Sequence, residues 1–206
     1  IVGATGAGKS TIINLLSRFY EIWDGEICLD GRDIRQVKLK SLRENLAVVL
    51  QDVFLFSDSI YNNIVLNKEV SREEVAEAAE FIGVSEFIET LPEQYDYNVQ
   101  ERGNMLSVGQ RQLLAFLRAY VSNPSVLILD EATSSIDTQS EMLIQSAIDK
   151  ITEGRTSVVI AHRLATIKKA DKILVMHEGK IVEQGTHESL LAENGYYTKL
   201  YEMQFK

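Results

Sequence analysis

The sequence predicts an α/β fold with a mainly parallel sheet and an inserted α-helical subdomain. Short apolar strands alternate with helices near both ends of the chain. The stretch between them, from about 59 to 121, has helical periodicity instead. A chain of 206 residues that is 45% hydrophobic is large enough to bury such a core. We therefore predict one domain, with a core at about 1–58 and 122–206 and a helical subdomain at about 59–121.

The first quarter of the chain predicts a strand, a glycine-rich loop, a helix and then short strands. Ile1 and Val2 are expected to end the first strand, and "TIINLLSRFY" is typical of an amphipathic helix. Its apolar face carries Ile12, Leu15, Leu16 and Phe19. Asp-Gly turns divide the next stretch into short β-type runs. "KSLRENLAVVLQD" then predicts a short helix capped by Ser41 and a buried strand at 47–50 that leads to Gln51.

The helical middle contains capping signals, and the last third of the chain returns to alternation. Ser71 and Glu74 predict a capping box, and Gly83 predicts the end of that helix. "SVLILD" and "TSVVIAH" are typical of buried strands, with one helix between them and another after them. "DKILVMHEGKIVEQG" predicts a hairpin that turns near Glu178 and Gly179, and two helices close the chain.

The composition narrows the classes of function. A net charge of −9 argues against a general affinity for nucleic acid, because that affinity depends on Lys and Arg. The single cysteine, Cys28, excludes an internal disulfide. No apolar run approaches the roughly 18 residues that a membrane-spanning helix needs.

A phosphate-binding loop follows the first strand. The stretch "GATGAGKST", residues 3–11, matches the pattern G-x-x-x-x-G-K-[ST] between a strand and a helix, which predicts a P-loop NTPase core of the RecA-like kind. Its glycines allow backbone N–H groups to turn toward a phosphate, and the helix start adds its positive end. Lys9 would reach the β- and γ-phosphates, and the Ser10 hydroxyl would ligate Mg²⁺. The residues predicted to contact the phosphates are Gly3, Ala4, Thr5, Gly6, Ala7, Gly8, Lys9, Ser10 and Thr11.

Two carboxylates supply the second half of the predicted site. "VLILDEATSSID" is a buried strand that ends in Asp130 and Glu131. Ligands of open α/β sheets bind at this carboxyl end of the strands. We expect Asp130 to hold Mg²⁺ or its waters, and Glu131 to accept a proton from the attacking water.

The stretch "ERGNMLSVGQRQLLAFLRAY" predicts a second helix that begins with a glycine in its first turn. Ser107 and Gln110 form a capping box, which explains the serine without a ligand. It does not explain Gly109, because a glycine there costs up to about 1 kcal/mol relative to alanine. Gly109 would expose backbone N–H groups at a positive helix end, and this predicts a second anion site.

These motifs together resemble those of the ATP-binding-cassette (ABC) ATPases. "LSVGQRQ" resembles that family's signature, and "GATGAGKST", Gln51, "LILDE", "SSID" and "VVIAHR" complete the family's order over essentially the whole chain. The resemblance implies an ATPase that uses ATP and Mg²⁺ and sandwiches two nucleotides between two such domains, head to tail. Each site would combine the phosphate loop of one domain with Ser107, Gly109 and Gln110 of the other.

The resemblance also implies roles for three further residues. Gln51 is similar to the residue that approaches Mg²⁺ and the attacking water. His162 is similar to the histidine that contacts the γ-phosphate, and Asp137 lies in the loop that crosses the dimer interface. The implied catalytic residues are Glu131, His162 and Gln51, and the implied metal ligands are Ser10, Gln51 and Asp130. His177 and His187 match no motif, and we expect them at the surface or in turns.

One position departs from the family's pattern. The signature more often reads Leu-Ser-Gly-Gly-Gln, and Val108 replaces the first glycine. Its side chain would either crowd the γ-phosphate of the partner's ATP or point away from it. The expected partner is a second ABC ATPase domain, which is either a copy of this chain or a different one.

Two segments resemble the exporter branch of the family, whose ATPase domains follow transmembrane domains. An "ERG" segment at 101–103 matches one that lies near the membrane domain's coupling helices, although a polar turn also explains it. Phe54 and Phe56 either line a groove for a partner helix or pack in the core. We therefore expect the motor of an exporter, at the cytoplasmic face of a membrane. The transmembrane domains and the adenine-stacking residue are expected upstream of Ile1.

Three alternatives stay open. The first is the separate ATPase subunit of an importer, and the second is a DNA-maintenance ATPase of the same family, which the net charge of −9 disfavours. The third is a module that holds ATP without turnover, which Val108 favours and Glu131 disfavours.

Overall fold

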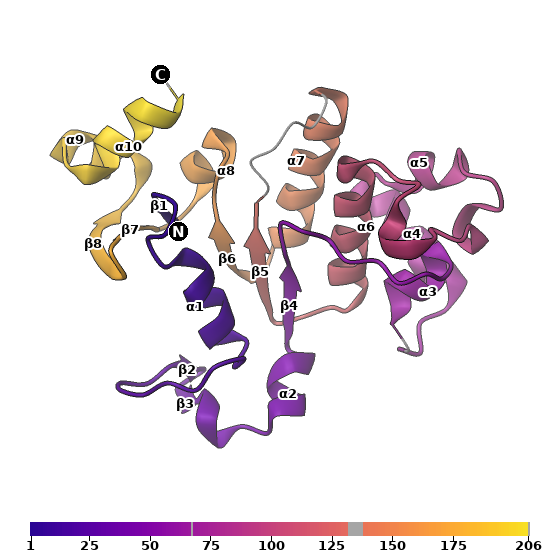
Figure 1. Ribbon diagram of the computed structural model, residues 1–206, viewed down its shortest axis with the longest axis horizontal. Helices are drawn as coiled ribbons and strands as arrows, with labels where there is room; N and C mark the ends of the chain where they lie inside the picture. Colours follow the sequence, from indigo (N-terminus) through magenta and orange to yellow (C-terminus); the bar gives the residue numbers. More distant parts are fainter. Residues whose placement is uncertain (67, 132–137, 206) are drawn as a thin grey trace. The chain divides into compact units, whose positions relative to one another are not determined.

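The computed structural model, drawn in Figure 1, describes residues 1–66, 68–131 and 138–205. The chain divides into two compact units. Unit 1 comprises residues 1–44, 128–133 and 158–206, and unit 2 comprises residues 45–127 and 134–157. No helix in the described ranges is long and apolar enough to cross a bilayer.

Unit 1 is built on a three-stranded sheet with the order β1-β7-β8. Strand β1 (Val2–Gly3) is parallel to β7 (Ile173–His177), which is antiparallel to β8 (Lys180–Gly185). The helices of this unit are α1 (Lys9–Leu16), α2 (Leu39–Glu44), α8 (Leu164–Lys169), α9 (His187–Glu193) and α10 (Tyr196–Phe205). Strands β2 (Cys28–Leu29) and β3 (Arg32–Asp33) form a small hairpin, followed by the 3-10 turn η1 (Ile34–Gln36). Buried side chains from β1, β7, α8, α9 and α10 form one apolar cluster.

Unit 2 is mainly helical and centres on α6 (Val108–Val121). Helix α6 contacts α3 (Ile60–Val65), α4 (Arg72–Ile82) and α7 (Thr138–Thr152), which surround it in Figure 1. Its buried face explains this position, because it carries Leu113, Leu114, Phe116 and Leu117. The remaining elements are α5 (Ser85–Glu89) and the 3-10 turns η2 (Gln94–Asp96) and η3 (Glu101–Gly103).

A second sheet has the strand order β4-β5-β6. Its strands are β4 (Leu46–Val49), β5 (Val126–Asp130) and β6 (Thr156–Ile160). The middle strand is apolar and buried from Val126 to Leu129, as expected of a strand covered on both faces. The chain passes between the two units along β5 and β6.

The predicted alternation of strands and helices is confirmed, and so are the local signals. Ser71 and Glu74 form the predicted capping box, and Gly83 ends α4 in the left-handed conformation. The hairpin turns at Glu178 and Gly179, which both have positive φ. Such φ values at both central residues are typical of two-residue hairpin turns.

Three local predictions are wrong. Ser41 lies inside α2 rather than at its start. The apolar face predicted for α1 is displaced, because Ile13 is its buried apolar residue and Phe19 lies exposed beyond the helix end. His187 is buried rather than at the surface, with its Nδ1 atom 2.6 Å from the Tyr197 hydroxyl.

Candidate functional site

The phosphate loop connects β1 to α1 within unit 1. Its first glycine is required by packing, because a Cβ atom on Gly3 would lie 2.5 Å from the carbonyl oxygen of Met176. The Ala7 amide donates to the Ala4 carbonyl at 3.1 Å, and the Gly179 amide donates to the Ala7 carbonyl at 3.0 Å. The loop is therefore closed by its own backbone and held against the turn between β7 and β8.

Helix α1 begins without a side-chain cap. Its N-cap, Gly8, has φ 98° and ψ 9°, and no side chain of the described residues accepts from its first amides. A left-handed N-cap of this kind favours glycine, because a Cβ atom would be strained there. The Ser10 and Thr11 side chains are exposed in the first turn. This helix end therefore presents free donors and hydroxyls to a ligand.

Lys9 is buried beneath the loop. Its Nζ atom donates to the carbonyl oxygens of Gly3 at 2.7 Å and Ala4 at 3.0 Å. Burial lowers the pKa of Lys9, and the Asp130 carboxylate partly opposes that shift. The ammonium charge is thus desolvated and only partly balanced by Asp130, and an anionic ligand would stabilise it further.

Asp130 and Glu131 end β5 as predicted, in two different environments. Asp130 is half-buried, and burial raises its pKa although His162 and Lys9 oppose the shift. Glu131 is only 2% exposed. Its Oε2 atom accepts from the amides of His162 at 2.9 Å and Arg163 at 3.1 Å, and its Oε1 atom accepts from the Thr166 hydroxyl at 2.6 Å. Our sequence prediction omitted Thr166.

His162 follows β6, next to the same carboxylates. Burial is the main cause that lowers its pKa, and repulsion from Lys9 adds to it. The imidazole is therefore mostly neutral at pH 7, with one nitrogen free to donate and the other to accept. Unit 1 thus brings Lys9, Asp130, Glu131 and His162 to the carboxyl end of its strands.

The chemistry of this site fits a magnesium nucleotide. The Ser10 hydroxyl and the Asp130 carboxylate are oxygen donors of the kind that Mg²⁺ prefers, and Mg²⁺ takes its other ligands from water and phosphates. Among the described residues there is no cluster of three or more His, Cys, Asp or Glu side chains that would form an all-protein metal site. Gln51 is exposed in unit 2, beyond the end of β4. Asp137 lies outside the described residues.

The predicted signature residues open α6 in unit 2. Ser107 and Gln110 form the predicted capping box: the Ser107 Oγ atom accepts from the Gln110 amide at 3.1 Å, and the Gln110 Oε1 atom accepts from the Ser107 amide at 2.9 Å. Gly109 is buried in the first turn, whereas Val108 is 44% exposed. The Val108 side chain therefore points away from the core of its own unit.

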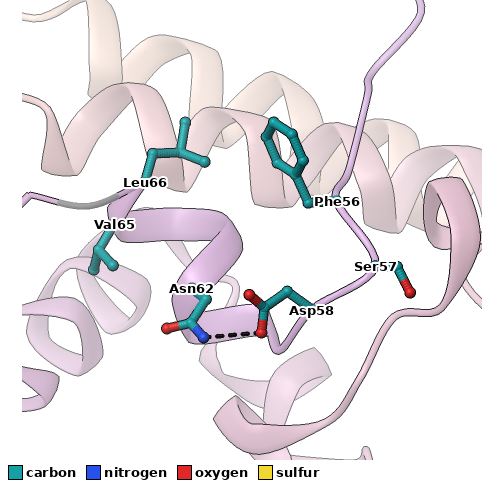
Figure 2. Close-up of a pocket in the computed structure, with 6 residues that line it drawn as sticks. All are labelled: Phe56, Ser57, Asp58, Asn62, Val65 and Leu66. Atoms are coloured by element: carbon teal, nitrogen blue, oxygen red, sulfur yellow. Dashed lines mark hydrogen bonds between the residues drawn. The ribbon is translucent and has the colours of Figure 1, made fainter.

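A groove lies on unit 2 beside the segment that follows Gln51. Its volume is about 710 Å³, and Figure 2 shows the lining residues, Phe56, Ser57, Asp58, Asn62, Val65 and Leu66. Phe54 and Phe56 form an edge-to-face pair with ring centroids 5.1 Å apart, and they are 54% and 52% exposed. This exposure excludes core packing for the two rings, which was one of the two alternatives.

Two polar side chains hold this aromatic segment, the buried Asn63 and the half-buried Arg118. The Asn63 amide accepts from the Phe56 backbone N–H at 2.7 Å and donates to the Phe56 carbonyl at 3.0 Å. Arg118 of α6 donates to the carbonyl oxygens of Asn63 at 2.8 Å and Phe54 at 3.3 Å. The groove is therefore attached to α6, the helix that begins at the signature.

The "ERG" segment at 101–103 forms η3 against the same aromatic segment. A Cβ atom on Gly103, which has φ 68°, would lie 2.8 Å from Leu55 Cδ1. Leu55 is fully buried between the two exposed phenylalanines. The segment is thus a polar turn that is packed beside the groove.

The chain is similar to ABC transporters along its whole length. The family model described as "ABC transporter" matches residues 1–134. The "ATP-dependent lipid A-core flippase" of Haemophilus influenzae (strain 86-028NP) is 54% identical over 207 residues, which covers 100% of this chain and 35% of that protein. The protein of the same name from Methylobacillus flagellatus is 49% identical, over 100% of this chain and 36% of its own length.

A solved structure agrees with these relatives. It is described as a bacterial Atm1-family ABC exporter with ATP bound, is 45% identical to this chain and has a TM-score of 0.91. The match covers 100% of this chain and 36% of that one. The chain therefore spans about a third of the length of the relatives that it matches.

Proposed function

Because this chain belongs to the ABC transporter family and forms the ATPase domain of its exporter type, we propose that it drives an exporter by binding and hydrolysing ATP. The observation that carries the proposal is the grouping of Lys9, Asp130, Glu131 and His162 beside the loop of unit 1. A cation can hold the phosphates, one carboxylate can bind Mg²⁺, the buried carboxylate can accept a proton from water, and the neutral imidazole can donate a hydrogen bond, so the four groups suit phosphoryl transfer to water.

Each group has a defined task in this proposal. The loop amides and Lys9 hold the phosphates, and the neutral His162 donates a hydrogen bond to the γ-phosphate. Ser10 and Asp130 would hold Mg²⁺, with Gln51 as the further ligand that the family resemblance implies, and the ion would neutralise charge on the β- and γ-phosphates. Glu131 accepts the proton of the attacking water.

A second ABC ATPase domain is the proposed partner, with ATP at the interface. The Ser107 Oγ atom uses an acceptor site to cap α6, so its O–H stays free to donate to a γ-phosphate held by the other domain. Gly109 and Gln110 would add the backbone at the same helix end, and Asp137 would cross the interface. The exposed Val108 side chain leaves both a copy of this chain and a different ABC domain as the partner.

Transmembrane domains are the other proposed partner. The groove beside Phe56 offers exposed aromatic rings, and Asp58 and Asn62 add polar groups on its wall. Such a surface suits a short helix with an apolar face. The domain would then act at the cytoplasmic face of a membrane and move the helices that dock there.

Replacement of Glu131 by glutamine tests this function. We expect Glu131→Gln in the full-length protein to lower hydrolysis by about 10² to 10⁴-fold, because an amide cannot accept the proton. ATP should still bind, and ATP-dependent association of the two ATPase domains should persist in size-exclusion chromatography. His177→Ala, at an exposed histidine outside the site, is the control. Unchanged hydrolysis in Glu131→Gln would contradict the proposed mechanism.

A further inference from the structure

The carboxylate of Glu131 is held by one short segment of unit 1. All three donors that bind it among the described residues come from the stretch that follows β6, at His162, Arg163 and Thr166. Two of these donors are backbone amides, and both bind Oε2. The third is the Thr166 hydroxyl, which binds Oε1.

The two oxygens are constrained in different ways. Two amides hold Oε2, but the carboxylate can still tilt about that atom when the other torsions of the side chain adjust, since the terminal torsion has no sharp minima of its own. The Thr166 hydroxyl binds the other oxygen at 2.6 Å, in the range of strong hydrogen bonds to an ionised acceptor. With both oxygens held, the carboxylate plane has one orientation. A free lone pair on Oε1 then faces a fixed direction.

The same segment also carries the proposed γ-phosphate contact. His162 supplies one of the amides on Oε2, and its side chain lies beside Asp130 and Lys9. Thr166 lies one helical turn further on, in α8. A single turn of chain therefore joins the residue that meets the phosphate to the residue that orients the base.

We propose that Thr166 is a positioning residue for ATP hydrolysis, and that its hydroxyl fixes the orientation of the Glu131 carboxylate toward the attacking water. The proposal rests on the proposed function, in which Glu131 is the general base. Thr166 touches neither water nor nucleotide in this role, and acts through Glu131 alone.

The first test compares two substitutions at this position in the full-length protein. Thr166→Val keeps the shape and removes the hydroxyl, and we expect kcat to fall about 10-fold, because a misoriented base loses part of the 10² to 10⁴-fold that general base catalysis contributes. The KM for ATP should stay within about 2-fold, since Thr166 makes no nucleotide contact. Thr166→Ser keeps the hydroxyl and should restore most of kcat.

The second test separates positioning from a structural role. In the Glu131→Gln background, adding Thr166→Val should lower the residual single-turnover rate no further, because two residues that act as one unit are not additive. The affinity for a fluorescent ATP analogue with Mg²⁺ should be the same with and without Thr166→Val. Thr152→Val is the matched control, since the Thr152 hydroxyl binds only carbonyls of its own helix among the described residues.

The two tests distinguish failure of the Thr166 proposal from failure of the proposed function. Wild-type kcat in Thr166→Val would overturn the proposal, and so would equal losses in the valine and serine variants or a further loss in the Glu131→Gln background. Weakened analogue binding would also overturn it, because Thr166 would then act on the nucleotide site directly. If Glu131→Gln alone retained full hydrolysis, the proposed function would fail instead, whatever Thr166→Val does.

Discussion

The two helix starts that carry functional glycines, at α1 and α6, are built in opposite ways. Helix α1 begins at Gly8 in the left-handed conformation, and no side chain of the described residues caps it. Helix α6 begins at Ser107, which is paired with Gln110 in a reciprocal capping box. The first helix start therefore leaves its donors for a ligand, and the second satisfies its own.

This difference separates two ways of binding one anion. The uncapped end at α1 has Lys9 buried beneath it, so its field is strong and its polar groups are compensated only in part. The capped end at α6 is stable by itself and offers one spare hydroxyl proton. A site assembled from both would gain its phosphate affinity mainly at α1 and its dependence on a partner domain at α6.

Of the changes considered, loss of the Lys9 ammonium beneath α1 should have the strongest effect. Lys9→Met removes a desolvated ammonium, and we expect ATP affinity to fall about 100-fold, since hydrogen bonds between charged groups contribute about 1.5–3 kcal/mol. The free energy of unfolding without nucleotide should not fall, because the buried charge is itself unfavourable. Calorimetric titration and thermal unfolding measure the two quantities. An equal loss of ATP affinity in Lys172→Met, at an exposed lysine, would indicate a nonspecific effect of charge.

A charge introduced at the start of α6 should have a weaker effect, on the rate of ATP hydrolysis. Ser107→Asp keeps a good N-cap, so the Tm should stay within about 2 °C. The new carboxylate would face the γ-phosphate in place of a hydroxyl, and hydrolysis should fall at least about 10-fold, because like charges brought together are costly. Ser71→Asp, at the capping box of α4, is the matched control and should leave hydrolysis unchanged. Unchanged hydrolysis in Ser107→Asp would show that Ser107 acts only as the cap of α6.

Features set by local sequence could be predicted, and features set by distant contacts could not. The capping boxes at Ser71 and Ser107 depend on residues three positions apart, so a pattern reveals them. The bond between Thr166 and Glu131 joins residues 35 positions apart, and a threonine in an ordinary helix gives no signal of it. His187 was misplaced for the same reason, because its partner Tyr197 lies in the next helix.

The aromatic groove shows a second limit. Phenylalanine is among the residue types that are most often buried, so the identity of Phe54 and Phe56 alone is compatible with a place in the core. Their exposure follows from the backbone between Gln51 and α3, which Asn63 and Arg118 fix through carbonyl and amide contacts. Those contacts come from two helices, so the sequence of the segment alone left both interpretations open.

The weakest of these effects is a difference in how pH changes the stability that His162 and the α6 cap contribute. Burial lowers the pKa of His162, so the unfolded chain binds a proton more readily than the folded one below the ordinary value of about 6.5. Stability without nucleotide should therefore rise as pH increases through the interval from the lowered pKa to about 6.5, and this contribution should be complete above it. Partial exposure limits the effect to about 1 or 2 °C in Tm. His162→Gln should reduce this slope in a thermal-unfolding series from pH 5 to 8, and the remaining slope comes from the Ile1 amino group, whose pKa is lowered by burial to about 6. The cap at Ser107 is uncharged, so the roughly 1 kcal/mol lost in Ser107→Ala should be the same at every pH in that series. A pH-dependent loss in Ser107→Ala would show that the two helix starts are coupled electrostatically, and the contrast between an open end and a self-satisfied end would then fail.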